Sequence, residues 1–175
     1  MIKNEPDFRT EAVLSIAQKM SVAARTAPKA KGFDFLEIAV LDGDDIKKIS
    51  GKMLEIGERE NNQTFIRDSK NILSSQAVVI IGTRKKTVGL RYCGLCGFKN
   101  CAENEKNNGI CVFNPGDLGI AVGSAVSVAA AHHIDNRVMY TIGMASIEMK
   151  LIGEDVKIAY GIPLSVSGKN PFFDR

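Results

Sequence analysis

The chain has 175 residues, of which 45% are hydrophobic and 25% charged, and its formal net charge is +3. This balance is typical of a folded protein with a sizeable core and excludes a disordered chain. Lys and Arg form no long stripe interleaved with aromatic residues, so we expect no nucleic-acid partner. The most apolar stretch, 118–134, is interrupted by Ser and His, which favours a buried helix over a membrane span.

The first half of the chain predicts alternating helices and strands. Apolar residues at helical spacing predict a helix over 11–26, and an apolar run rich in strand formers predicts a strand over 35–41. Asp44 or Asp45 should cap a second helix that ends near residue 60, followed by a third over 63–74. Residues 77–83 are apolar on both faces, as expected of a central strand.

The second half begins with a change in composition and hydrophobic pattern. Residues 88–116 contain all four cysteines and many Gly and Asn without clear periodicity, which predicts a loop-rich insertion. The remaining residues predict a long helix over 117–133, a strand over 137–142, a short helix over 144–151 and a last strand over 156–161. An extended tail should follow over 162–175. We find no linker, so residues 1–175 should form a single α+β domain with three layers.

The cysteines follow the pattern Cys-x2-Cys-x4-Cys-x9-Cys, formed by Cys93, Cys96, Cys101 and Cys111. The N-terminal residues are charged and lack the apolar run of a signal peptide, so we expect a cytoplasmic protein. Four neighbouring thiols in that compartment are more often ligands than disulfide partners. Only the first pair has zinc-knuckle spacing, which favours an iron–sulfur cluster and leaves a zinc-stapled structural domain as an alternative.

The run CGLCGFKNCAE, with Cys111 beyond it, resembles the four-iron cluster modules of Rnf-type electron-transport subunits and corrinoid iron–sulfur proteins. In those modules a CGxCGxxxC-like run is followed by a fourth cysteine. Here the gap before the fourth cysteine is shorter and holds charged residues. The resemblance implies a 4Fe–4S cluster on the four cysteines, with Cys111 as the fourth ligand.

Three further blocks, over 23–53, 117–143 and 157–175, resemble the FMN-dependent nitroreductase family in the same order. Together with the cysteine motif, the chain resembles the prokaryotic family described as containing a ferredoxin domain. The resemblance implies a nitroreductase-like α/β/α sandwich with a cysteine insertion over 88–116. The resemblance also implies a flavin site. Pro28, Ile142, Gly143 and Arg175 match positions of that site in the family. Arg25, Lys29 and Lys31 are cations close to Pro28 in the sequence.

The expected function is that of an iron–sulfur redox protein. The first hypothesis is an oxidoreductase that passes electrons between the cluster and FMN or a small acceptor. The second is a non-enzymatic electron carrier without flavin, which would meet a redox partner protein. The nitroreductase resemblance also implies a homodimer, to which the small-residue helix over 118–133 and the two aromatic residues Phe172 and Phe173 of the tail should contribute.

Overall fold

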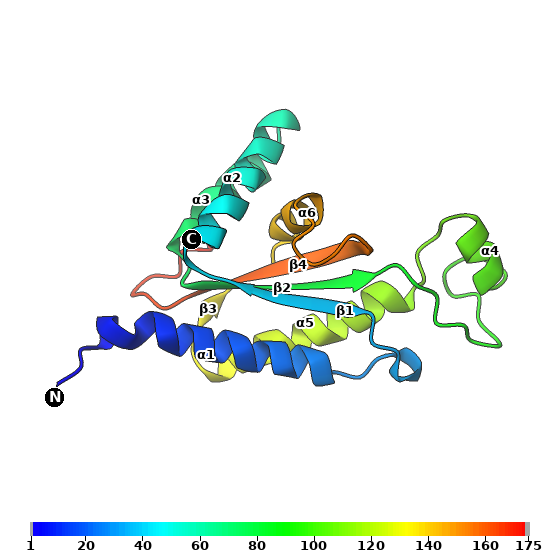
Figure 1. Ribbon diagram of the computed structural model, residues 1–175, viewed down its shortest axis with the longest axis horizontal. Helices are drawn as coiled ribbons and strands as arrows, with labels where there is room; N and C mark the ends of the chain where they lie inside the picture. The colour runs from blue at the N-terminus through cyan, green and yellow to red at the C-terminus, as the bar shows by residue number, and fades with distance from the viewer. Residues whose placement is uncertain (1, 174–175) are drawn as a thin grey trace.

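The computed structural model describes residues 2–173 and contains a four-stranded sheet between two helical layers (Figure 1). The strand order is β1-β2-β4-β3, and every neighbouring pair is antiparallel. The strands are β1 (Leu36–Leu41), β2 (Ala77–Arg84), β3 (Asp135–Asn136) and β4 (Val156–Ser165). The predicted central strand is confirmed, since β2 lies between two partners.

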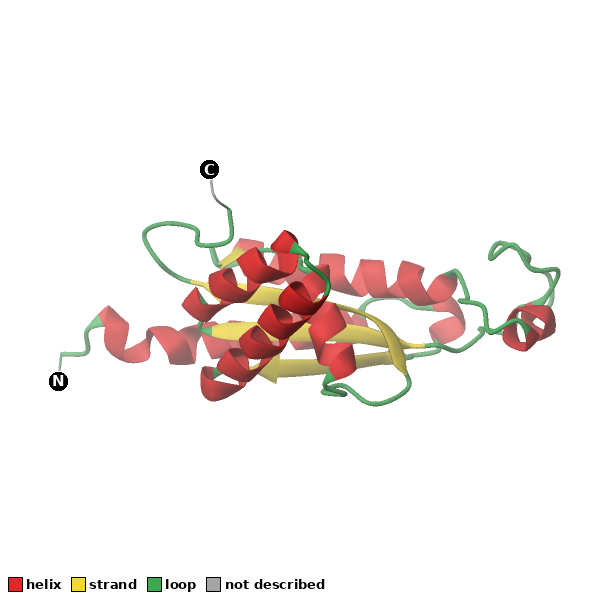
Figure 2. Cartoon of the chain, turned by 90° about the horizontal axis from the view of Figure 1, so that it is seen from above, coloured by secondary structure: helices red, strands yellow, loops and turns green. Residues whose placement is uncertain are grey.

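Helices cover both faces of the sheet, as the two views at right angles show (Figures 1 and 2). One layer contains α1 (Glu5–Thr26) and α5 (Phe113–Ala131), and the other contains α2 (Gly43–Arg59), α3 (Gln63–Asn71) and α6 (Tyr140–Glu148). Two short 3-10 helices, η1 (Ala30–Gly32) and η2 (Ile72–Ser74), follow α1 and α3. The predicted three-layer α+β sandwich is therefore confirmed. No helix within residues 2–173 is both long and apolar enough to cross a membrane.

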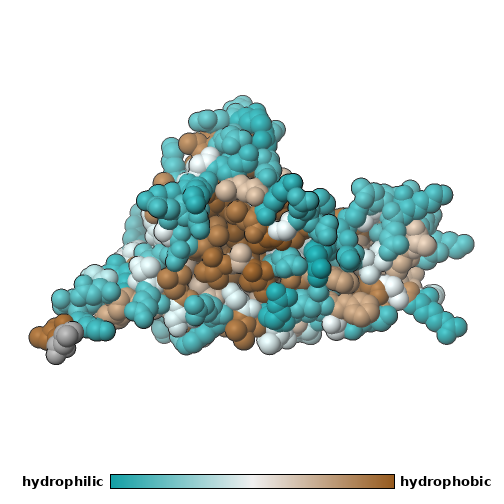
Figure 3. All heavy atoms as spheres, in the orientation of Figure 1, coloured by the Kyte–Doolittle hydropathy of each residue, from teal (hydrophilic) through white to brown (hydrophobic). Residues whose placement is uncertain are grey.

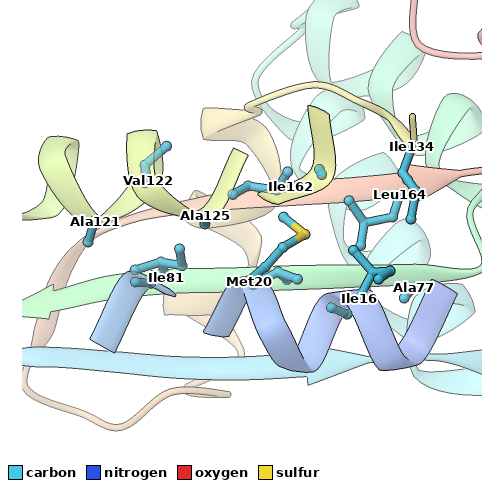
Figure 4. Packing of buried hydrophobic residues seen from close by; sticks show 14 of the residues in the cluster. Ile16, Met20, Ala77, Ile81, Ala121, Val122, Ala125, Ile134, Ile162 and Leu164 are labelled. Carbon is cyan, nitrogen blue, oxygen red and sulfur yellow. The ribbon is translucent and has the colours of Figure 1, made fainter. Parts of the chain in front are cut away.

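The alternation of side chains along β2 divides the core in two. Val79 and Ile81 point into the layer of α1 and α5, while Val78 and Ile80 point into the layer of α2, α3 and α6. All four side chains are fully buried. Figure 4 shows the first of these cores, where Met20 of α1 and Ala125 of α5 meet residues of β2 and β4.

Four helices, α1, α2, α5 and α6, begin before the predicted residue, and α5 begins at Phe113, within the predicted insertion over 88–116. A capping box between Asn4 and Asp7 starts α1 at residue 5, where the apolar periodicity has not yet begun. Asp42 occupies the N-cap position of α2, so the prediction of a cap at Asp44 or Asp45 was wrong. Both carboxylates instead lie in the first turn, where the helix dipole favours negative charge.

The predicted strand over 137–142 was wrong, because β3 ends at Asn136 and α6 begins at Tyr140. Met139 still pairs with Gly161 of β4 through two backbone hydrogen bonds of 2.8 and 3.0 Å. The chain then turns into a helix that packs directly on β4. A Cβ atom at Gly143 would lie 1.8 Å from the carbonyl oxygen of Ala159, so this close packing requires glycine.

The tail folds back on its own subunit. The predicted last strand continues to Ser165, four residues further than expected. Phe172 is fully buried in the core under α2, α3 and α6, and its carbonyl accepts a 2.8 Å hydrogen bond from Arg137. The guanidinium of Arg137 also lies 5.1 Å from the ring centroid of Phe173. The expectation that these aromatic residues anchor a partner was therefore wrong for Phe172.

Candidate metal centre

The cysteine-bearing segment, residues 85–112, connects β2 to α5 and projects beyond the end of the sheet (Figure 1). It contains the short helix α4 (Cys101–Lys106) and is otherwise made of turns and irregular chain. Antiparallel β2 and β4 end their pairing at Arg84, so the segment leaves the sheet without a neighbouring strand.

All four cysteines line one narrow pocket with a free volume of about 10 Å³. Cys93, Cys96 and Cys101 are half-buried, whereas Cys111 is buried, and all four are free thiols. The structure thus brings together residues that are up to 18 positions apart in the sequence. The loop-rich character predicted for this part of the chain agrees with the observed backbone.

The spacing of the thiols bears on the choice of metal. No group of three or more Cys, His, Asp or Glu side chains within residues 2–173 converges closely enough to hold a metal ion. Zinc would need its sulfur ligands about 2.3 Å from one ion. In a 4Fe–4S cluster each cysteine binds a different iron, so the four sulfur atoms surround a larger volume. The four thiols thus line one narrow pocket, and either a zinc ion or a cluster would require them to rearrange around it.

Glycine shapes the turn between the first two cysteines. Gly97 has a φ of +85°, a conformation that residues with a Cβ rarely adopt, and its N–H donates to the carbonyl of Gly94 over 2.9 Å. The turn places Cys93 and Cys96 on the same cavity, as expected from their spacing.

Side-chain capping fixes the third cysteine. Asn100 is the N-cap residue of α4, and its side chain accepts a 2.9 Å hydrogen bond from the N–H of Glu103. The carboxylate of Glu103 in turn accepts a 2.6 Å hydrogen bond from the N–H of Lys99. These reciprocal bonds define the first turn of α4, which begins with Cys101.

Two buried asparagines position Cys111. The side chain of Asn104 donates to the backbone carbonyl of Ile110 over 3.2 Å. The backbone carbonyl of Asn104 accepts a 2.8 Å bond from the N–H of Gly109. On the other side, the side chain of Asn114 donates to the carbonyl of Lys86 over 2.9 Å, while its N–H donates to the carbonyl of Cys111. Sequence reasoning missed these asparagines, although the richness of the segment in Asn is visible in the sequence.

The cationic residues expected near a flavin make contacts within the chain. Arg25 donates to Asp34 over 2.8 Å and to the carbonyl of Leu36 over 2.9 Å. The ammonium of Lys29 is hydrogen-bonded to three carbonyls at the end of α1, including that of Ala27 at 2.9 Å. Lys29 therefore acts as a C-terminal cap for α1.

These cations also affect the carboxyl group of Asp34. Partial burial raises the pKa of Asp34, but hydrogen bonds from Arg25 and from the N–H of Leu36, with the charges of Arg25 and Lys29, outweigh burial. The net result is a pKa below its usual value, so Asp34 stays ionised and holds the end of α1 against β1.

The turn that contains Pro28 lies beside the cysteine segment. Pro28 and Lys29 line an open, mainly apolar cavity of about 420 Å³, together with Leu95 and Val112. Leu95 and Val112 are the direct neighbours of Cys96 and Cys111 in the sequence. Lys31, in the adjoining η1, reaches the carbonyl of Gly89 at 3.4 Å. The structure therefore places part of the predicted flavin site next to the candidate metal centre.

The other predicted flavin residues are placed differently. Ile142 and Gly143 lie in α6, buried in the layer opposite to α1, and so are not gathered with Pro28. Arg175 lies outside the described residues.

Comparison with known proteins agrees with this architecture. Residues 107–175 match the family described as "Uncharacterized protein containing a ferredoxin domain". A protein of Archaeoglobus fulgidus, described as an uncharacterized protein, is 45% identical, and the match covers 100% of this chain and 98% of that protein.

Two solved structures share the fold. A BluB-like flavoprotein from Clostridium difficile is 18% identical with a TM-score of 0.60, covering 89% of this chain and 81% of its own. A nitroreductase with bound FMN from Desulfitobacterium hafniense is 12% identical with a TM-score of 0.60, covering 96% and 92%. At these identities the likeness shows the fold alone. The sandwich therefore defines a protein of the nitroreductase fold with a cysteine-lined cavity at one end of its sheet. The chain belongs to the family of proteins that contain a ferredoxin domain.

Proposed function

We propose that the chain is an iron–sulfur redox protein that holds a 4Fe–4S cluster on Cys93, Cys96, Cys101 and Cys111. The observation that carries the proposal is that all four thiols, from three separate stretches of the segment, line one pocket. The match to a family described by its ferredoxin domain supports the same class of cofactor. When bound, such a cluster supplies one-electron transfer.

The chain's own residues would position the thiols and limit access of water. The glycine turn, the Asn100 cap and the bonds of Asn104 and Asn114 hold each cysteine-bearing stretch in place. Phe98 and Val112 line the cavity between the thiols and add apolar surface. A low dielectric strengthens every interaction between the cluster and the nearby backbone dipoles.

The test is to measure metal and sulfide in protein purified without oxygen. We expect about four irons and four acid-labile sulfides per chain, as in a cubane cluster. Cys96→Ser should lose most of the iron, because serine is a poorer ligand than a thiolate. Ala102→Ser, at an exposed neighbour of Cys101, is the matched control and should keep it. One zinc per chain without iron would support the zinc-stapled alternative and reject the proposal.

A second proposal concerns a small acceptor or flavin beside the cluster. The cavity that Pro28 and Lys29 share with Leu95 and Val112 favours it, because a flat ring bound there would approach two cysteine-bearing turns. The contacts of Arg25 and Lys29 within the chain leave Lys31 as the more available cation of this group for a phosphate.

Titration of the cluster-loaded protein with FMN tests this second proposal through quenching of flavin fluorescence. We expect micromolar binding, weakened about tenfold by Lys31→Ala, which corresponds to about 1.4 kcal/mol. Lys19→Ala, at an exposed site on α1, should have no effect. If FMN does not bind up to about millimolar concentration, its dissociation constant is weaker than that of most specific sites. The electron-carrier hypothesis then replaces that of a flavin enzyme.

We also propose that the protein is a homodimer. Figure 3 shows an apolar, hollowed surface over the sheet between α2 and α6. The edge strand β1 is apolar, yet five of its six residues are only half-buried. On the opposite layer, α5 is apolar around its whole circumference and exposes Gly116, Gly119, Ile120 and Gly123. Such surfaces are uncommon on monomers and permit close approach of a second copy.

Light scattering should report about twice the 19.0 kDa mass of the chain. Ile120→Glu, which places a charge in the proposed interface, should shift the protein toward the monomer. Thr10→Glu, at an exposed residue near the start of α1 and outside the surfaces named above, is the control. A monomeric wild-type protein at micromolar concentration would reject the dimer.

A further inference from the structure

The positive charge of the molecule is concentrated in the cysteine end. Residues 84–112 contain six Lys or Arg and two Glu, a net charge of +4, against +3 for the whole chain. The remaining 146 residues thus carry a net charge close to zero. A charge asymmetry of this kind guides a charged partner to one end of a protein.

The cations at this end are available, whereas the anions are occupied. Lys86, Arg91 and Lys99 are exposed and make no ion pair within residues 2–173. Glu103 instead accepts a bond from the backbone of Lys99, and Glu105 accepts one from the hydroxyl of Thr87. Each of the three cations lies near a cysteine. Arg91 and Lys99 are two positions before Cys93 and Cys101, and Lys86 shares a hollow with Cys111.

Large apolar side chains of the same segment are also exposed. Tyr92 is 97% exposed and Leu95 is 73% exposed, and they directly precede Cys93 and Cys96. Ile110 and Val112, on either side of Cys111, are each 38% exposed. Every one of these side chains is next to a cysteine in the sequence, so exposed apolar surface lies beside the candidate metal centre. An apolar centre with a polar rim is the usual composition of a protein interface.

We infer that the projecting end of the molecule is a docking surface for a small acidic one-electron carrier protein. This inference rests on the proposed iron–sulfur function. Complementary charge would steer an acidic carrier toward Lys86, Arg91 and Lys99, and the apolar side chains beside the cysteines would exclude water at the contact. Electron-transfer partners form small, short-lived interfaces, for which a patch on one projecting segment is large enough.

The transfer involves a single electron and no change of covalent bonds. The reduced carrier would lose one electron and be oxidised, and Cys93, Cys96, Cys101 and Cys111 would hold the cluster that accepts that electron. The carrier is itself the reductant, so no further reactant is needed. Direct contact beside the cysteines shortens the path, because each thiolate is a ligand of the cluster in the proposed site.

A protein partner fits the surface better than a nucleic acid does. Nucleic-acid sites depend on several Lys or Arg that contact phosphates along a groove or stripe. Here the free cations are few, and of the exposed side chains beside the cysteines, Tyr92, Leu95, Ile110 and Val112, only Tyr92 offers a ring for base stacking. Competition by duplex DNA therefore serves as one arm of the test.

The experiment measures electron transfer by stopped flow between a reduced acidic 4Fe–4S ferredoxin, used as the probe, and the oxidised cluster-loaded protein. The test variant reverses three charges, Lys86→Glu, Arg91→Glu and Lys99→Glu. At low ionic strength we expect its second-order rate constant to fall at least about tenfold, and the wild-type rate to fall as salt is added. Iron and sulfide are measured first on each protein, so that loss of the cluster is distinguished from loss of docking.

The matched control reverses three exposed lysines elsewhere, Lys3→Glu, Lys19→Glu and Lys70→Glu, which changes the net charge equally. We expect its rate constant to stay within about threefold of wild type, because distant charges are screened. Equal slowing of both variants, or equal rates for all three loaded proteins, would overturn the docking surface while leaving the cluster in place. Inhibition of the transfer by duplex DNA at physiological salt would assign the patch to nucleic acid instead.

Discussion

The sheet and the cysteine-bearing segment are stabilised in different ways. Seven of the eight residues of β2 are buried, and its side chains fill two apolar cores. In residues 85–112 only Val88, Asn104 and Cys111 are buried, and hydrogen bonds from asparagine replace apolar packing. We therefore expect the sheet and its helices to fold without a cofactor, whereas the segment has little apolar burial of its own to hold it rigid.

The largest effect is expected from Gly143→Ala on the sheet side. The new methyl group would meet the backbone of Ala159, which cannot move without disturbing β4, so α6 must shift away from the sheet. We expect a loss of about 3–5 kcal/mol in the free energy of unfolding, at the upper end for single substitutions. Urea denaturation followed by circular dichroism measures it.

Gly51→Ala is the matched control for that substitution. Gly51 is an exposed residue of α2, and a Cβ atom there would meet nothing within 4 Å. Alanine should stabilise α2 by about 0.5–1 kcal/mol, because it restricts the unfolded chain. Equal stability of the two variants would contradict the close packing of α6 on β4.

Removal of the cluster should affect the segment and spare the sheet. After an iron chelator has bleached the protein, we expect limited proteolysis within residues 85–112 to become at least about tenfold faster, as expected for local opening. The thermal midpoint of far-ultraviolet circular dichroism should change by no more than a few degrees, on the order of 1 kcal/mol. Loss of the whole cooperative transition would show that the fold depends on the cofactor.

Asn104→Ala should weaken the segment alone. It removes the side-chain bond to the part-buried carbonyl of Ile110, at a cost of about 1 kcal/mol. We expect faster loss of iron to a chelator than in wild type, with an unchanged urea midpoint. Lys106→Ala, at an exposed residue of the same helix, is the control and should behave as wild type.

The smallest effect is expected at Asp34, where α1 meets β1. Because the pKa of Asp34 is lowered in the folded state, its contribution to stability is present above the unfolded pKa of about 3.9 and is lost as pH falls through the folded value. Solvent screening limits this contribution to about 1 kcal/mol. Asp34→Asn should therefore lose less stability than wild type between pH 7 and pH 3. An identical pH dependence would argue against the ion pair with Arg25.

Apolar periodicity predicted the sandwich well, because burial dictates both the period of each helix and the strand position of β2. It failed over 137–142, where the chain makes one bridge at Met139 and then enters α6 at Tyr140, packed closely on β4 through Gly143. The spacing of the cysteines predicted the candidate metal centre. The fixing roles of Asn104 and Asn114 could not be predicted, since long-range hydrogen bonds leave no periodic pattern. The contacts of Lys29 with its own helix were hidden for the same reason.

Electron paramagnetic resonance of the dithionite-reduced protein tests the central claim most directly. Protein prepared without oxygen should be brown before reduction and bleach with dithionite. The reduced form should give a low-temperature signal of about one spin per chain, as expected of a reduced 4Fe–4S cluster. Cys111→Ser should lose or alter this signal, because Cys111 is the buried thiol of the cavity. Protein that gives no signal and contains one tightly bound zinc ion per chain would contradict the account.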